Sequence, residues 1–423
     1  MRAKIRASMI VLLVMTAGSA GAQFQYTPPG GPPQRPENRK EELDRKAAQA
    51  RYHLGPVRLE PWAAVKDVAY VRSLFNSDGA AQPGDLTATA GAGFTAYLRD
   101  SSKATWTLDV LPEYVWWRRE SERRRLNGRY QLGFHGFFNR LTLEGTAGRE
   151  QQLKIITPEV PVLATGRADG GEVLAEVEIS SAVFAFSSVA LSKQTHLVDT
   201  EPDPLTRSLA LLDRKERLIR GGLRWVPRRR WSVALGVEDT REDFERTALP
   251  RSNRGTSPLL QINYQGYNTG FQAELEDRSL KAQRGSDFVP FHQVTGRSSF
   301  VVGAHSLVRG SFYANRDLLY ALAAGYAYLQ DDRVGAALLI NFGFHTSGRL
   351  FGETGRNTYT GFTAAIPHRV DDVSSIGGGI DIDLGGRAIL GIQALRSHFN
   401  SNLPGGDRTF SSAGLTVNVF GGR

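Results

Sequence analysis

The sequence predicts an all-β fold, a transmembrane antiparallel up-and-down β-barrel of about 16–18 strands. Three observations support this fold class. Long stretches show alternating apolar and polar residues, the connections between these stretches are alternately short and long, and an export signal precedes the first strand. A soluble enzyme of 423 residues seldom contains so many half-apolar segments. The chain is therefore expected to form one large domain whose sheet has an apolar face turned toward lipid.

Residues 1–22 have the features of a signal peptide. Three basic residues precede the apolar run from Met9 to Met15, and Ala20-Gly21-Ala22 supplies the small residues that signal peptidase requires. We expect the mature chain to begin near Gln23 and to be exported. The absence of cysteine suits a protein that crosses an oxidising compartment, and it excludes a disulfide framework and a lipid-modified cysteine.

Residues 23–53 are predicted to form a periplasmic tether followed by a short helix. The Pro-rich stretch FQYTPPGGPPQRP favours an extended chain, and ENRKEELDRKAAQARY after it contains good helix formers with charges on most faces. Two interpretations of the helix stay open. It is either a solvated helix of one or two turns, or a helix that docks a periplasmic partner or plugs the barrel.

Residues 54–423 carry the alternating pattern of the barrel. Trp106, Leu108 and Val110 alternate with Thr107 and Asp109, so that all apolar side chains of this strand lie on one face. The segments are long enough for tilted strands, which need roughly 9–11 residues to cross the hydrocarbon. Aromatic residues near predicted strand ends are expected to form interfacial girdles. These residues are Tyr114, Trp116, Trp117, Phe137, Trp225, Trp231, Tyr326 and Tyr328.

Short and long connections alternate along most of the chain. Tight turns are predicted at 101–102, 139–140, 227–230, 266–267, 330–333 and 385–386, and longer polar connections at 72–85, 118–126, 154–171, 195–215, 245–257, 281–291 and 346–357. This order is typical of a barrel with short periplasmic turns and long outer loops. The segments total about 19 strands, but single-chain bacterial barrels normally have an even number, so we expect about 18.

These features together resemble bacterial outer-membrane β-barrels over roughly residues 54–420. More narrowly, LGPVRLEPWAAVKDVAYVRSLFN, followed by successive hairpins, looks like the start of barrels encoded with exopolysaccharide export systems. The resemblance implies an outer-membrane location in a Gram-negative type of envelope, with contacts to membrane lipid, to lipopolysaccharide and to the barrel-insertion machinery. The narrower resemblance would add an anionic polysaccharide as a partner.

The sequence offers little sign of catalysis. It contains no Walker loop, zinc motif, nucleotide fingerprint or nucleophile elbow, and its histidines are scattered without ligand spacing. We therefore expect no cofactor, no metal and no enzyme. A formal charge of +9 is modest for 423 residues, so nucleic-acid binding is not expected either. One alternative stays open, an outer-membrane hydrolase that assembles serine and histidine from neighbouring strands.

Arginines are the strongest candidate functional residues. The polar, lumen-facing positions predicted for Arg129, Arg220 and Arg224 would let them select anions, because guanidinium groups in a narrow channel bind carboxylates and phosphates. A second basic cluster, in a predicted outer loop, comprises Arg118, Arg119, Arg123, Arg124 and Arg125. The loop arginines could instead pair with Glu120, Glu122 or lipopolysaccharide phosphates. The lumen arginines could instead pair with Glu113, Glu144, Glu238, Glu274 and Glu276 and hold the barrel shut.

The function expected from these features is passive transport. The leading hypothesis is a porin-like channel for polar or anionic solutes, or for a polysaccharide in transit, with selectivity from arginines in its wall. A structural or secretion-accessory barrel with a closed lumen is the first alternative, and the hydrolase is the second.

Overall fold

The computed structural model describes residues 39–71, 85–157, 159–198, 204–228, 230–246, 250–303, 307–323, 325–343, 345–385 and 388–421. The predicted signal peptide and the Pro-rich part of the tether lie outside these residues.

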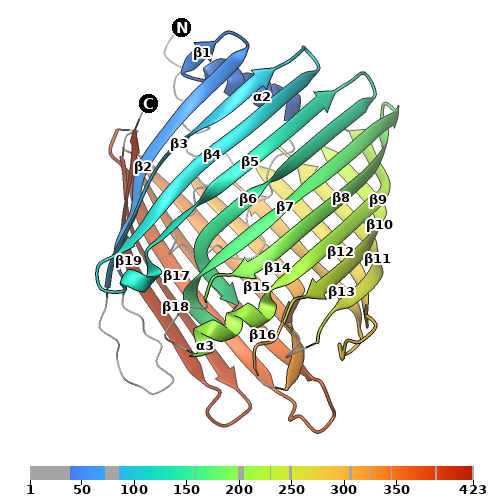
Figure 1. Ribbon diagram of the computed structural model, residues 1–423, viewed down its shortest axis with the longest axis vertical. Helices are drawn as coiled ribbons and strands as arrows, with labels where there is room; N and C mark the ends of the chain where they lie inside the picture. Colours follow the sequence, from blue (N-terminus) through green and yellow to red (C-terminus); the bar gives the residue numbers. More distant parts are fainter. Residues whose placement is uncertain are drawn as a thin grey trace.

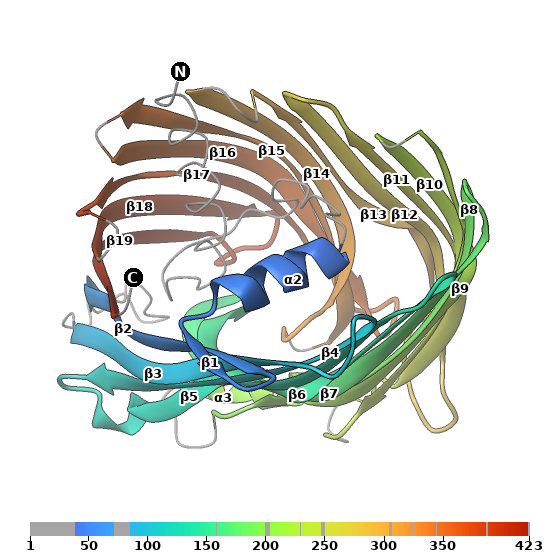
Figure 2. The same ribbon diagram turned by 90° about the horizontal axis from the view of Figure 1, so that it is seen from above.

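Within the described residues, eighteen strands, β2 to β19, form one closed antiparallel ring (Figures 1 and 2). Each strand pairs with the next along the chain, and β19 pairs with β2 to close the ring. The short strand β1 (Tyr52–Leu54) pairs only with β2, as its hairpin partner. The predicted up-and-down barrel is confirmed, and its strand number is the even one expected.

The strand bounds follow the chain in order. The first nine are β2 (Val57–Val71), β3 (Asp85–Arg99), β4 (Ala104–Trp117), β5 (Arg125–Phe137), β6 (Leu141–Thr157), β7 (Val160–Ser180), β8 (Val183–His196), β9 (Arg214–Arg228) and β10 (Trp231–Phe244). The other nine are β11 (Asn253–Gln265), β12 (Thr269–Ala282), β13 (Phe291–Val302), β14 (Val308–Tyr320), β15 (Tyr326–Gly343), β16 (Thr346–Gly361), β17 (Val370–Asp383), β18 (Ala388–Ser401) and β19 (Arg408–Gly421).

The two faces of the sheet differ in polarity, as the alternation predicts. On the outward face Leu223, Leu235 and Val237 are half exposed or more, although they are large and apolar. On the inward face of the same strands Arg220 and Glu238 are directly opposite each other. An apolar outer wall around a polar interior is stable only where lipid covers the wall. The fold is therefore that of a transmembrane barrel.

The two ends of the barrel differ in their connections. One end, which we call the short-turn end, has tight connections such as 100–103, 138–140 and 229–230, and β2 starts and β19 ends there. The opposite end, the loop end, has longer connections such as 197–213, 245–252 and 283–290. The loop end also holds two single-turn elements, α3 (Pro204–Arg207) and η3 (Ser208–Leu212).

Three predicted connections are wrong. Residues 330–333 lie inside β15, 346–357 lie inside β16, and 154–171 are divided between β6 and β7, which pair up to Thr157 and Val160. At 330–333 the strand has charged residues on both faces. Asp331 pairs with Arg333 on the inside, and Asp332 pairs with Arg316 on the outside. A strand segment that is polar on both faces has no apolar alternation, so the pattern predicts a turn.

The aromatic girdle is only partly confirmed. Trp225 and Trp231 are exposed on the outward face near the short-turn end, and Trp231 stacks on Tyr264 with ring centroids 4.6 Å apart. In contrast, Trp117, Tyr326 and Tyr328 are buried. Trp117 lies on the inward side by the parity of β4, and Tyr326 and Tyr328 are covered by the apolar clusters at the loop end.

Helix α2 (Arg39–Gln49) lies within the segment where a helix was predicted. In the view along the barrel, α2 crosses the space inside the ring, near the short-turn end (Figures 1 and 2). Neither it nor the other helices of the described residues are long and apolar enough to span a membrane.

Candidate functional site in the barrel lumen

Arg220 is at the centre of a charged cluster on the inner wall. Its Nε lies 2.5 Å from Glu238 Oε2, and its Nη2 lies 3.6 Å from Glu274 and 3.5 Å from Glu276. A second guanidinium, Arg297, approaches Glu274 at 3.5 Å. Three carboxylates thus face two guanidinium groups at this level of the lumen. The arrangement is mixed in sign, and it is more acidic than the sequence hypothesis of an arginine-lined wall.

The other two predicted lumen arginines are also paired. Arg224 forms an ion pair with Glu176 and lies over the ring of Phe184, 5.2 Å from its centroid. Arg129 is 3.6 Å from Asp109 on the neighbouring strand. The lumen side predicted for Arg129, Arg220 and Arg224 agrees with the strand parity. Of the partners predicted from sequence, Glu238, Glu274 and Glu276 lie beside Arg220, while Glu144 pairs with Arg39 of α2 and with His135, because pairing depends on strand register.

The outer-loop arginines divide into two groups. Arg123 lies 2.9 Å from Glu120, and Arg124 donates from Nε to the carbonyl oxygen of Trp117 at 2.7 Å. Arg125 donates to the carbonyl oxygen of Leu197 in the connection between β8 and β9. These three arginines therefore hold loops together. Arg118 and Arg119 are exposed at the loop end.

The hairpin formed by β6 and β7 reaches across the loop end. Its turn carries Glu159, whose carboxylate accepts hydrogen bonds from the backbone nitrogens of Leu322 at 2.5 Å and Ala323 at 3.4 Å. Leu322 and Ala323 are 163 and 164 residues from Glu159 in the chain. These hydrogen bonds therefore connect the β6–β7 hairpin to the end of β14. Burial raises the pKa of the Glu159 carboxyl, although the two backbone donors, Arg369 and Arg408 oppose that shift.

An apolar cluster packs beside this hairpin. It joins β7, the β8–β9 connection, the β12–β13 connection, β14 and β15, and its members include Ala164, Leu209, Phe288, Leu318 and Tyr328. Arg251, in the β10–β11 connection, is fully buried near the same region, with its guanidinium 6.0 Å from the ring centroid of Phe362. Burial lowers the pKa of Arg251 to about 10. The loop end of the lumen is therefore partly filled by the protein's own side chains.

Helix α2 narrows the short-turn end. Leu43, Ala47 and Ala50 are buried against Tyr97, and Phe137 packs on the same cluster. Ion pairs add to this contact, between Arg99 and Asp44 and between Arg39 and Glu144, the latter at 3.7 Å. The helix buries one face on the inner wall, so the interpretation as a freely solvated helix is wrong.

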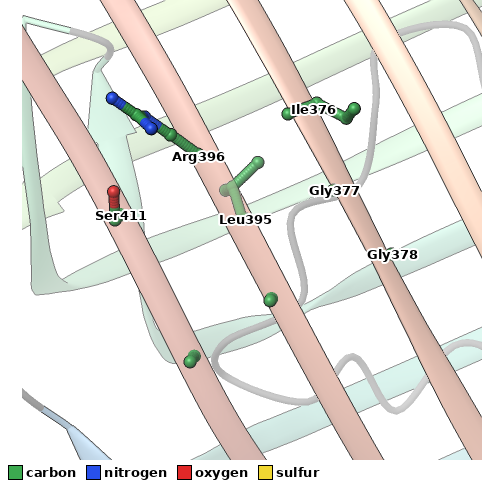
Figure 3. Close-up of a pocket in the computed structure, with 8 residues that line it drawn as sticks. Ile376, Gly377, Gly378, Leu395, Arg396 and Ser411 are labelled. Carbon is green, nitrogen blue, oxygen red and sulfur yellow. The ribbon is translucent and has the colours of Figure 1, made fainter.

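A shallow pocket on β17, β18 and β19 is not part of the lumen (Figure 3). Ile376, directly opposite Arg396 in the register, is exposed on the outward face. The small residues Gly378, Ala394 and Ala413 leave the wall thin beside them. This depression faces the membrane, and it offers no pathway for a polar solute. Among the described residues, no group of three or more His, Asp or Glu side chains is placed to hold a metal ion.

The sequence missed three parts of this site. The β6–β7 hairpin was predicted as a loop, because Pro158 and Pro161 interrupt its apolar tip and the residues 166–172 that follow are polar on both faces. The Glu159 contact joins residues far apart in the chain, and no local signal marks it. The acidic partners Glu176 and Asp109 are visible in the sequence, but their register with Arg224 and Arg129 is not.

Comparison with solved structures shows what the fold is similar to. The chain resembles OccAB4 from Acinetobacter baumannii with a TM-score of 0.50 and 12% identity, over 86% of this chain and 97% of that one. It resembles a BenF-like porin from Pseudomonas fluorescens Pf-5 with a TM-score of 0.51 and 10% identity, over 87% and 99%. It resembles the outer membrane protein opdK of Pseudomonas aeruginosa with a TM-score of 0.52 and 9% identity, over 86% of this chain and 98% of that one.

No protein-family model matches the chain, and no curated protein matches it. At these identities the likeness establishes the fold alone. That fold is an outer-membrane β-barrel of the porin type, and it gives no support to the hydrolase alternative.

Proposed function

We propose that this protein is a porin-like channel for polar solutes in a Gram-negative-type outer membrane. The observation that carries the proposal is a closed ring of strands with an apolar outer wall, a charged inner wall and a hairpin directed inward at one end. In such barrels the short turns face the periplasm and the longer loops face outward. Residues 1–22 would act as the export signal, and the barrel-insertion machinery would receive the exported chain.

Preference for anionic solutes is the finer part of the proposal. Arg129, Arg220 and Arg224 line the lumen, but each lies beside a carboxylate that offsets its charge. A solute carboxylate or phosphate would compete with these protein carboxylates for the guanidinium groups. The preference for anions over cations would then depend on the ratio of arginine to acidic side chains in the lumen. Removing arginines should shift this preference toward cations.

Single-channel recording in planar bilayers tests both parts. Under a salt gradient, Arg220→Gln combined with Arg224→Gln should move the reversal potential toward cation preference, because the remaining glutamates face a confined channel where charges are weakly screened. The matched control, Arg123→Gln with Arg124→Gln, should change it much less. A wild-type barrel that inserts and never conducts would contradict the channel. A channel with an unchanged reversal potential would contradict only the selectivity.

A closed structural barrel is the second candidate, and α2 favours it. The helix, the β6–β7 hairpin and the apolar cluster occupy both ends of the lumen. Leu43→Glu would place a charge in the contact with Tyr97 and release the helix from the wall. If conductance appears only in this variant, the closed barrel is favoured over the open channel.

A role in exopolysaccharide export is the narrowest proposal. It rests on the segment LGPVRLEPWAAVKDVAYVRSLFN and the hairpins that follow it. Neighbouring genes for polysaccharide polymerases or export factors would support it. Polysaccharide secretion that is normal in a deletion strain would contradict it.

A further inference from the structure

Four cations stand side by side on the outward face of the barrel at the loop end. They are Arg217, Arg241, Arg254 and Lys281, and we call them the cation row. Arg217 is directly opposite Arg241 in the strand register, and Arg241 is directly opposite Arg254. Arg254 is in turn directly opposite Lys281. All four are exposed. Like charges at directly opposed positions destabilise a sheet, so the row needs anions against it.

The protein supplies only part of this counter-charge. Arg217 lies 3.1 Å from Asp239, and Arg241 lies 3.0 Å from Asp243. Among the ion pairs formed by the described residues, none includes Arg254 or Lys281. The half of the row on β11 and β12 therefore forms no ion pair among the described residues.

The row lies just beyond the apolar wall. On the same strands and the same face, Val237 is exposed four positions from Arg241, and Leu275 is exposed six positions from Lys281. Strands rise about 3.3 Å per residue and tilt by about 45° in such barrels, which places the row roughly 10 Å along the barrel axis from Val237. At that height the outward side chains meet lipid headgroups.

A second row at the same end has the opposite pattern. Arg316, Asp332, Arg356 and Asp372 are directly opposed on β14, β15, β16 and β17, and we call them the alternating row. Arg316 pairs with Asp332 at 2.6 Å, and Arg356 pairs with Asp372 at 2.8 Å. The same barrel thus builds one row that neutralises itself and one that does not.

We propose that the cation row is a binding site for a phosphorylated lipid headgroup of the outer leaflet. Neighbouring strands are about 4.8 Å apart, so four strands span roughly 14 Å, which is long enough to meet more than one phosphate. Guanidinium groups bind phosphate bidentately, and the ammonium of Lys281 adds a point charge at the end of the row. The adjacent apolar wall would contact the acyl chains of the same lipid.

Titration of the folded barrel in neutral detergent with fluorescent bisphosphorylated lipid A tests the site. Arg254→Gln combined with Lys281→Gln should weaken binding roughly thirtyfold at low salt, since each surface cation contributes about fivefold to binding an anionic lipid. Arg316→Gln with Arg356→Gln is the matched control, with equal loss of charge at the same end. Its binding should stay within about twofold of wild type. Heat-modifiable migration on a gel verifies that each variant is folded.

The native protein supplies a second comparison. Wild-type barrel should bind bisphosphorylated lipid A more tightly than the same lipid without phosphates. Equal affinity for the two lipids would overturn the site, as would equal weakening in both double variants. Full displacement by inorganic phosphate at millimolar concentration would show that the row binds an adventitious ion only. These readouts do not involve conductance, so they are independent of the channel proposal.

Discussion

The cation row and the alternating row are built on the same strand geometry and differ in the sign of alternate residues. In the alternating row, Asp332 and Asp372 each approach an arginine within 3 Å, so the charges are satisfied inside the chain. In the cation row, Arg254 and Lys281 are in none of the ion pairs formed by the described residues. A row of paired opposite charges on the barrel surface requires no counter-ion from the membrane. A row of cations requires an anion from outside the protein.

The interior behind the two rows also differs. Behind the cation row, Asn253 donates to Glu242 at 3.1 Å and to Tyr320 at 2.7 Å, and Leu280 is buried in the apolar cluster. The alternating row stands on β14 and β15, whose connection receives the β6–β7 hairpin through Glu159. The two sectors therefore meet inside the barrel, through Asn253 and Tyr320 and through the apolar cluster, and they differ in the charge of their outward rows.

The largest expected effect comes from converting the cation row into an alternating one. Arg254→Glu would place a carboxylate between Arg241 and Lys281, its direct neighbours in the register. Removing one cation and adding one anion should weaken lipid A binding by about 2 kcal/mol, or roughly thirtyfold. The same titration measures it. Binding as tight as wild type would refute the role of the row.

A smaller effect is expected where the hairpin meets the sector of the alternating row. Glu159→Ala removes the acceptor for Leu322 and Ala323 and leaves two backbone donors unsatisfied, which costs on the order of 1 kcal/mol. We expect a freed hairpin tip and a noisier, larger single-channel conductance. A conductance trace identical to wild type would show that the tip does not narrow the pathway.

The docking of the β6–β7 hairpin through Glu159 should also depend on pH. Because burial raises the pKa of docked Glu159 above its ordinary 4.5, the docked hairpin binds a proton more readily than a free one. Docking is therefore strongest below pH 4.5 and weakens as pH rises through the docked-state pKa. Conductance noise should increase over that window. Glu159→Gln, which keeps an acceptor oxygen and cannot ionise, should remove this pH dependence while leaving the hairpin docked.

Turning part of the alternating row into a line of cations should lower the free energy of unfolding by about 1 kcal/mol. Asp332→Lys breaks the ion pair with Arg316 and places three cations in a line on β14, β15 and β16. Loss of exposed pairs and new repulsion should destabilise the barrel by about 1 kcal/mol in urea unfolding. The variant should also gain affinity for lipid A. Destabilisation without any gain in binding would mean that a line of cations is not sufficient for a lipid site.

The smallest effect is expected at the short-turn end. Arg99→Gln removes the exposed ion pair with Asp44 of α2, while the contact of Leu43 and Ala47 with Tyr97 stays. The change in unfolding free energy should be about 0.5 kcal/mol or less. Lipid A binding should not change, because this arginine lies far from both rows. Any loss of binding here would indicate a nonspecific dependence on total charge.

Much of the fold was predictable because alternation is a local property. The residues Trp106, Leu108 and Val110 lie on the outward face, as their spacing requires, and the inward side of Arg220 follows from the same parity. Tight turns at 101–102 and 266–267 were predicted correctly for the same reason, since turn residues act within a few positions.

Tertiary structure alone decided which side chains meet. Arg241, Arg254 and Lys281 form a row only because two hairpins fix the register of β10, β11 and β12. Glu159 reaches Leu322 across the barrel, and α2 packs inside the ring. The sequence by itself determined the barrel and the face of each strand residue, because a period of two is read from neighbours. Register, ring closure and inward-folded segments join residues distant in the chain, so only the folded barrel decided the charged clusters.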